Sequence, residues 1–83
     1  MERTMDMTIA TPDGVLFEGQ VNSAKFPGAM GAFMVLPMHA PIISALAEGR
    51  VSYTPVNGEP VELAVKGGFV EVRKDVISVC VET

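Results

Sequence analysis

VELAVKGGFVEVRKDVISVCV, which occupies residues 61–81, is the stretch of sequence that decides the fold. Apolar residues alternate with polar or small ones in three short runs, which are 61–65, 69–73 and 77–81. A period of two is typical of strands that bury one face. Gly67-Gly68 interrupts the first run, and Lys74-Asp75 separates the other two. The stretch therefore predicts short strands joined by tight turns.

The same pattern extends over the rest of the chain. Residues 5–9 alternate, Thr11-Pro-Asp-Gly14 is a turn sequence, and Asn57-Gly58 is a strong hairpin signal. We expect a first hairpin over residues 5–21 with a bulge or close backbone approach at Gly19. Three further segments follow. Ser23–Phe26 is expected to be a short strand, and Phe33–Leu36 a strand buried on both faces or in an interface. Ile42–Ala47 is expected to form one or two helical turns. The expected fold is all-β, a small β-sandwich or flattened barrel of about eight to ten short strands with at most one short helical turn.

Length and composition limit the classes of function. The 83 residues make one domain, 1–83, with 48% hydrophobic residues and a net charge of −4. The six basic residues are scattered, so we expect no nucleic-acid binding, which requires a basic patch. Apolar runs are too short for a membrane span, and the first residues do not resemble a signal peptide, so no direct membrane insertion is expected. Cys80 is the only cysteine, which fits a reducing compartment.

Candidate chemical groups are few. His39 is the only histidine, and no serine or cysteine motif surrounds it, so we interpret it as a structural or interface residue. Cys80 faces away from Val79 and Val81 and is interpreted as a small packing residue. Neither residue has enough companions for a zinc site, and the glycine pairs lack the spacing of a phosphate loop. We expect no cofactor, no metal and no catalytic residue.

The segment Phe26–Pro41 has a different character. Its prolines and glycines exclude a helix of ordinary length and indicate a fixed shape at a surface. Met30, Met34 and Met38 lie within it, and so small a protein cannot bury all three. Flexible thioether side chains suit protein interfaces, although some could fill gaps in the core.

Taken together, the motifs resemble one family. Eight short motifs occur in the order found in the N-terminal β-sandwich domain of the epsilon subunit of F-type ATP synthase, called delta in mitochondria. They are Thr11-Pro-Asp-Gly14, Phe17-Glu-Gly19, Pro27-Gly28, Gly31, Phe33, Val35-Leu-Pro37, His39-Ala-Pro41 and Gly67-Gly-Phe-Val-Glu-Val72. The chain departs from the family at three positions. Met34 and Met38 stand where the family usually has glycine, and Ala32 stands where many members carry a polar or acidic residue.

This resemblance implies a central-stalk rotor subunit that couples the gamma subunit to the c-ring during proton-driven ATP synthesis and performs no catalysis. It implies a c-ring interface made of Gly28, Ala29, Met30, Gly31 and Ala32. It implies a gamma interface made of Thr11, Met38, His39, Ala40, Pro41, Ile42 and Ile43. The expected location is the cytoplasmic face of the bacterial inner membrane, peripheral and within the ATP synthase complex. Many members continue into a C-terminal helical hairpin, which we expect to be absent here, so no ATP binding is expected.

Two other classes of function remain open at this point. One is a free-standing β-sandwich that binds another protein, and the other is a small β-barrel enzyme that uses His39. Association with gamma separates the rotor subunit from the free-standing module.

Overall fold

The computed structural model describes residues 3–83, and eight strands account for most of them. The strands are β1 (Met5–Thr11), β2 (Gly14–Phe26), β3 (Phe33–Val35), β4 (Ile42–Leu46), β5 (Gly49–Pro55), β6 (Val61–Val65), β7 (Gly67–Arg73) and β8 (Val76–Glu82). No helix occurs among the described residues. The all-β prediction is confirmed, with a strand number at the lower end of the expected range.

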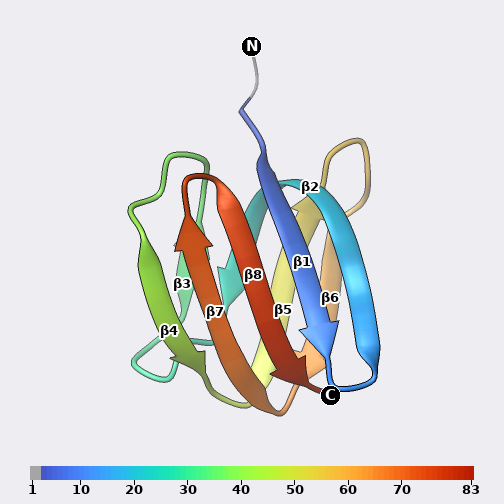
Figure 1. Ribbon diagram of the computed structural model, residues 1–83, viewed down its shortest axis with the longest axis vertical. Coiled ribbons are helices and arrows are strands. Elements are labelled where there is room, and N and C mark those ends of the chain that lie inside the picture. Colours follow the sequence, from blue (N-terminus) through green and yellow to red (C-terminus); the bar gives the residue numbers. More distant parts are fainter. Residues whose placement is uncertain (1–2) are drawn as a thin grey trace.

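The strands form one curled sheet that folds into two layers. Their order is β4-β7-β8-β1-β2-β5-β6, and β3 pairs with the last residues of β2 on the edge opposite β5. Every pair is antiparallel except β1 with β8, which is parallel. In the view of Figure 1, β4, β7, β8 and β1 make a front layer, and β3, β5 and β6 lie behind it. This two-layer arrangement is the expected β-sandwich.

The long strand β2 connects the two layers. Its first part pairs with β1, and its last residues pair with β5 and β3. The register with β5 shifts between Val21 and Ser23, where the strand passes from one layer to the other. Ser23–Phe26 is therefore the end of β2 and not a separate strand, because this irregularity bends the strand without ending it.

The prediction of helical turns at Ile42–Ala47 is wrong, because this segment contains strand β4. Five residues of β4 pair with β7, from Ile42 opposite Val72 to Leu46 opposite Gly68. An isolated helix of six residues is unstable in water, whereas the strand gains a complete antiparallel ladder with β7. The nonlocal pairing thus decides the conformation of a segment whose local pattern was ambiguous.

At Gly19 the expectation was a bulge or a close backbone approach, and at Phe33–Leu36 it was burial on both faces or in an interface. The register irregularity between β1 and β2 lies at Leu16, since Ile9 is opposite Phe17 and Ala10 is opposite Val15. Gly19 instead provides close approach, because a Cβ there would lie 3.3 Å from the tip of the Phe17 ring. Strand β3 buries one face only, with Val35 fully buried and Met34 54% exposed.

The core lies between the layers and contains only hydrophobic side chains and Tyr53. Its members are Met5, Met7, Ile9, Val21, Ala24, Phe26, Val35, Leu46, Val51, Tyr53, Val65, Val70, Val72, Ile77, Val79 and Val81. Two aromatic pairs extend it, with ring centroids 4.6 Å apart for Phe17 and Tyr53 and 5.7 Å apart for Phe26 and Phe33. Each large side chain buried in this way contributes about 1.5 to 3 kcal/mol, which stabilises a small domain.

The segment after β2 joins the two layers along one side of the sandwich. The Ala29 amide donates to the Ala45 carbonyl at 2.9 Å, and the Ala47 amide donates to the Pro27 carbonyl at 2.8 Å. Gly28 and Leu46 form an isolated antiparallel bridge between these bonds. The start of the Gly28–Ala32 segment is therefore fixed to the last residues of β4.

Candidate interaction surfaces

The expected c-ring residues form a tight loop with a fully exposed apolar tip. The Gly31 amide donates to the Gly28 carbonyl at 3.0 Å, which closes a four-residue turn. A Cβ at Gly28 would lie 2.9 Å from the Phe33 ring and 2.5 Å from the Gly31 carbonyl oxygen, so only glycine fits there. Met30 is 100% exposed at the tip. The loop is thus held in shape, contains no ionisable side chain and presents one large apolar side chain to solvent.

A second loop, Leu36–Pro41, contains four of the expected gamma residues. The His39 amide donates to the Leu36 carbonyl at 3.1 Å across a turn whose two central residues are Pro37 and Met38. Met38 has a φ of 70° and its side chain is 69% exposed. The His39 ring atom Nδ1 lies 2.6 Å from the Ala40 carbonyl oxygen. The loop therefore has a defined backbone shape and exposes the methionine side chain.

The two loops lie at opposite ends of the molecule. In Figure 1, Leu36–Pro41 is above the start of β4, and Gly28–Ala32 is beside its end. Strand β4 begins with Ile42 and Ile43, which follow directly on Leu36–Pro41. The residues expected to face the c-ring are therefore grouped in one place, as are six of the seven expected to face gamma.

Thr11 lies apart from the other six gamma residues. It ends β1 at the end of the sandwich that also carries Gly28–Ala32. Its Oγ1 accepts a hydrogen bond from the Asp13 amide at 3.1 Å and donates to the Gly14 carbonyl at 3.1 Å. The hydroxyl thus stabilises the β1–β2 turn. Only a partner that covers much of the front layer can contact both Thr11 and Ile43.

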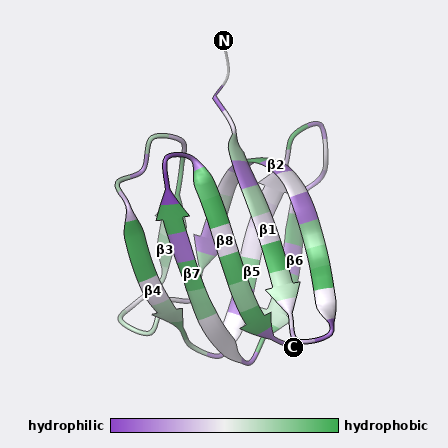
Figure 2. Cartoon of the chain, viewed as in Figure 1, coloured by the Kyte–Doolittle hydropathy of each residue, from purple (hydrophilic) through white to green (hydrophobic). Residues whose placement is uncertain are grey.

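The outer surface of the front layer carries a row of apolar side chains, which we call the apolar row. The row consists of four residues on neighbouring strands. Phe69 of β7 is opposite Ala45 of β4 on one side and Cys80 of β8 on the other, and Cys80 is opposite Ala10 of β1. Phe69 is 52% exposed, although it is one of the largest apolar side chains in the chain. Figure 2 shows hydrophobic segments recurring along β4, β7 and β8. The row lies between Ile43 of β4 and the end of β1, where Thr11 follows Ala10.

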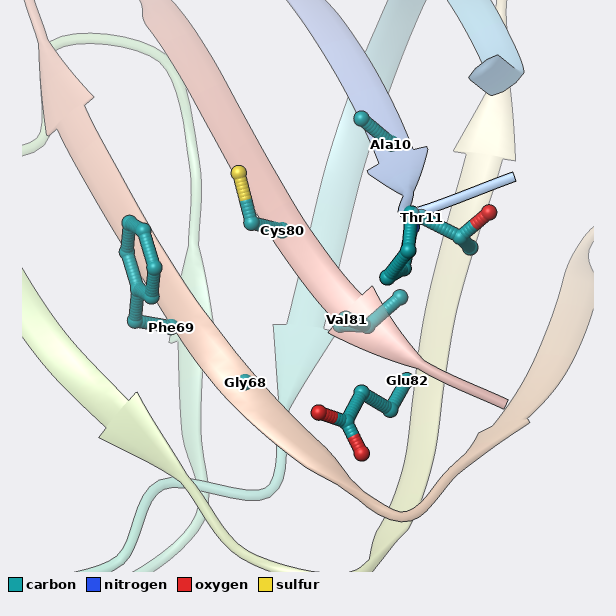
Figure 3. Close-up of a pocket in the computed structure, with 8 residues that line it drawn as sticks. Ala10, Thr11, Gly68, Phe69, Cys80, Val81 and Glu82 are labelled. Carbon is teal, nitrogen blue, oxygen red and sulfur yellow. The ribbon is translucent and has the colours of Figure 1, made fainter. Parts of the chain in front are cut away.

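A hollow of about 380 Å³ lies beside the apolar row, at the end of the molecule near Thr11. Phe69, Cys80, Ala10, Thr11, Pro12 and Gly68 contribute to its lining. Figure 3 shows Phe69, Cys80 and Ala10 on three neighbouring strands, with the Glu82 carboxylate at the margin. A surface of this kind suits an apolar side chain of a partner protein, since fixed polar groups are few within it.

Sequence reasoning did not identify the apolar row. The alternation of residues 77–81 assigned Cys80 to the face opposite the core, and the structure confirms this assignment, but the side chain is exposed and not packed. Phe69 is the first residue of a predicted strand and follows two glycines, which do not indicate on which face of the sheet its side chain lies. The signal would have been the strand phase, because Val70 and Val72 are buried and Phe69 must face the other way.

The described residues offer little for chemistry. No group of three or more His, Cys, Asp or Glu side chains within residues 3–83 is arranged to hold a metal ion. In the same part of the chain, no helix is long and apolar enough to cross a membrane. Burial raises the pKa of the Tyr53 phenol above its ordinary value of 10.0, which keeps this core residue neutral.

The fold resembles that of two solved chains from rotary ATP synthases. One is in a mitochondrial ATP synthase complex of Euglena gracilis containing OSCP, F1 and the c-ring, with a TM-score of 0.89 at 20% identity, covering 96% of this chain and 51% of that one. The other is in the central stalk and c-ring of Tetrahymena thermophila mitochondrial ATP synthase, with a TM-score of 0.80 at 15% identity. That match covers 99% of this chain and 66% of the Tetrahymena chain. The two likenesses define the class of fold, a β-sandwich.

Sequence comparison gives the family. The model of the ATP synthase delta/epsilon chain β-sandwich domain matches residues 4–83, so the chain belongs to that family, and the resemblance of the motifs is confirmed. The ATP synthase epsilon chain of Nitratidesulfovibrio vulgaris (strain DP4) is 40% identical over all 83 residues, and that of Desulfitobacterium hafniense (strain Y51) is 34% identical over 83 residues. The chain spans 61% and 62% of the length of these two relatives.

Proposed function

We propose that the protein is a central-stalk rotor subunit of an F-type ATP synthase. It would couple gamma to the c-ring during proton-driven ATP synthesis and would have no catalytic activity of its own. The observation that carries this proposal is the pair of preformed loops, Gly28–Ala32 and Leu36–Pro41, at opposite ends of one family-typical sandwich. The names of the relatives, ATP synthase epsilon chain, support the same assignment.

The proposed c-ring interface is the loop Gly28–Ala32. Its turn hydrogen bond and its attachment to β4 support this role, because a loop that is already ordered loses less entropy on binding. Met30 would be the principal contact, since its side chain is fully exposed in the free protein. The loop carries no charge, so we expect the affinity for the ring to depend little on ionic strength.

The proposed gamma interface extends from Met38–Ile43 across the front layer to Thr11. Exposed Ile43 and Phe69, 73% and 52% accessible, give this surface apolar area to bury, about 1.5 to 3 kcal/mol for each side chain that becomes fully covered. We therefore add Phe69, Cys80, Ala45 and Ala10 to the residues expected to contact gamma. The complex would hold the protein at the cytoplasmic face of the bacterial inner membrane without insertion into the bilayer.

Co-purification tests the proposal. A tagged chain expressed with the gamma subunit of the same organism is expected to recover gamma in a one-to-one complex. Recovery of the chain alone, with both proteins folded, would contradict the rotor assignment and favour a free-standing binding module.

A matched pair of substitutions tests which surface faces gamma. Ala45→Asp places a charge beside Phe69 in the front layer, whereas Ala64→Asp places the same charge on the outer face of β6, opposite Arg50. Both alanines are exposed in strands. We expect Ala45→Asp to weaken the gamma complex about tenfold or more, because a buried unpaired charge is costly, and Ala64→Asp to leave it unchanged. Equal affinities for the two variants would remove the front layer from the interface.

A further inference from the structure

The turn at Leu36–His39 contains a residue in an unfavourable backbone conformation. Pro37 occupies its second position and Met38, with a φ of 70°, its third, which is the arrangement of a type II turn. The third position of such a turn normally requires glycine, because a side chain there crowds the backbone. A methionine in this conformation persists only where the surrounding structure holds it. The exposed side chain of Met38 provides little of that support.

The support comes from Asp75, which lies 37 positions further along the chain. The Met38 amide donates a hydrogen bond of 2.7 Å to Oδ1 of Asp75. This amide has no partner within a type II turn, so the carboxylate satisfies it, and hydrogen bonds to charged acceptors are the stronger ones. The contact joins the loop between β3 and β4 to the turn between β7 and β8.

Asp75 is itself fixed to the sheet. Lys74 and Asp75, with φ values of 51° and 62°, form the two-residue turn between β7 and β8. The Asp75 carbonyl oxygen also accepts a hydrogen bond of 2.9 Å from the Asp6 amide at the start of β1. The carboxylate therefore projects from a turn that three strands hold in place, and it adds a fixed anchor to the loop's own hydrogen bond from the His39 amide to the Leu36 carbonyl.

We propose that Asp75 is a positioning residue that fixes Leu36–Pro41 in the conformation that binds gamma. This inference rests on the proposed function. With the carboxylate in place, the loop is ordered before gamma arrives. Without it, the strained turn would exchange among other conformations, and the apparent affinity would fall in proportion to the population of the competent one.

Two substitutions at position 75 separate the carboxylate from the turn that carries it. Asp75→Gly removes the acceptor but suits the positive φ of the β7–β8 turn, and Asp75→Asn keeps both an acceptor oxygen and tolerance of that φ. Lys74→Gly is the control, because it changes the same turn and leaves Asp75 in place. Each variant is titrated with purified gamma subunit of the same ATP synthase, and amide hydrogen exchange at Met38 is followed in the free chain.

We expect Asp75→Gly to raise the dissociation constant for gamma about tenfold and to accelerate exchange at Met38 by a similar factor. Asp75→Asn and Lys74→Gly should stay within about twofold of the wild type. Wild-type affinity and wild-type exchange in Asp75→Gly would overturn the role of Asp75 alone. Failure of the wild-type chain to bind gamma would instead overturn the proposed function, and this inference with it.

A double substitution distinguishes positioning from direct contact with gamma. Glycine at position 38 adopts the turn without support, so Asp75→Gly should cost only about two- to threefold in affinity when introduced into Met38→Gly. An equal loss in the two backgrounds would show that the carboxylate acts on gamma itself, and positioning would be refuted.

Discussion

Replacing Met38 by glycine should stabilise this protein, although the substitution removes an apolar side chain. Met38 has a φ of 70°, a conformation that costs a residue with a Cβ about 1 to 2 kcal/mol. Its side chain is 69% exposed, so little buried area is lost with it. Its hydrogen bond to Asp75 uses the backbone amide, which glycine retains.

The expected gain follows from two opposing terms. Relief of the left-handed conformation favours glycine by about 1 to 2 kcal/mol, and the greater freedom of glycine in the unfolded chain returns about 0.4 to 1 kcal/mol. The free energy of unfolding should therefore rise by about 0.5 to 1 kcal/mol. For a domain of this size, that corresponds to an increase of about 2 to 8 °C in the midpoint of thermal unfolding.

Met34 provides a matched control, because it is also an exposed methionine, with 54% of its side chain accessible. Met34 lies in β3 opposite Lys25, and its φ is not positive. Met34→Gly should lower the free energy of unfolding by about 0.5 to 1 kcal/mol, since glycine weakens a strand interior. Thermal and urea unfolding of both variants measure the two changes. A Met38→Gly protein no more stable than the wild type would refute the argument from backbone strain.

Three further outcomes are expected. Gly68→Ala should abolish folding, as judged by circular dichroism, because a Cβ at Gly68 would collide with the Cys80 carbonyl at a φ of +146°, whereas Gly67→Ala should be tolerated. Because the pKa of Tyr53 is raised, the neutral phenol stabilises the fold below pH 10, and this contribution is lost as the pH rises further. In urea unfolding at alkaline pH, the free energy of unfolding should therefore fall more steeply with pH in the wild type than in Tyr53→Phe. Arg50→Ala should change the free energy of unfolding by less than about 1 kcal/mol, because its 3.1 Å contact with Glu62 joins exposed side chains.

The elements that could be predicted are those whose signals are local. Alternation and turn residues give the hairpin across Lys74-Asp75, the loop at Asn57-Gly58 and the orientation of Cys80 away from Val79 and Val81 without any knowledge of pairing. Ile42–Ala47 could not be assigned in this way, because six residues carry too little periodicity to separate a strand from a helical turn. Its pairing with β7, more than twenty residues away, decides the outcome.

The candidate surfaces also differ in whether their signals are local in the sequence. Motif resemblance located the two loops, because their glycines and prolines are conspicuous in the sequence. The parallel pairing of β1 with β8 brings Ala10 beside Cys80, and no local signal reports a contact between the two ends of the chain. The hydrogen bond from Met38 to Asp75 is equally nonlocal. The apolar row and the anchor of the loop therefore became visible only in three dimensions.

The strand conformation of β4 bears directly on the proposed coupling. Ile42 follows the loop Leu36–Pro41, and the other end of β4 is hydrogen-bonded to Pro27–Ala29, where the proposed c-ring loop begins. Five residues of strand span about 16 Å, whereas five residues of helix would span about 8 Å. The two loops are also joined directly by β3, whose three residues lie between Ala32 and Leu36. Because β4 is also paired along its length with β7, a force applied at either loop is carried by a hydrogen-bonded ladder and not by a flexible connection. If the two loops bind gamma and the c-ring, two strands link them mechanically: β3 directly through the chain, and β4 through its hydrogen bonds to Pro27–Ala29.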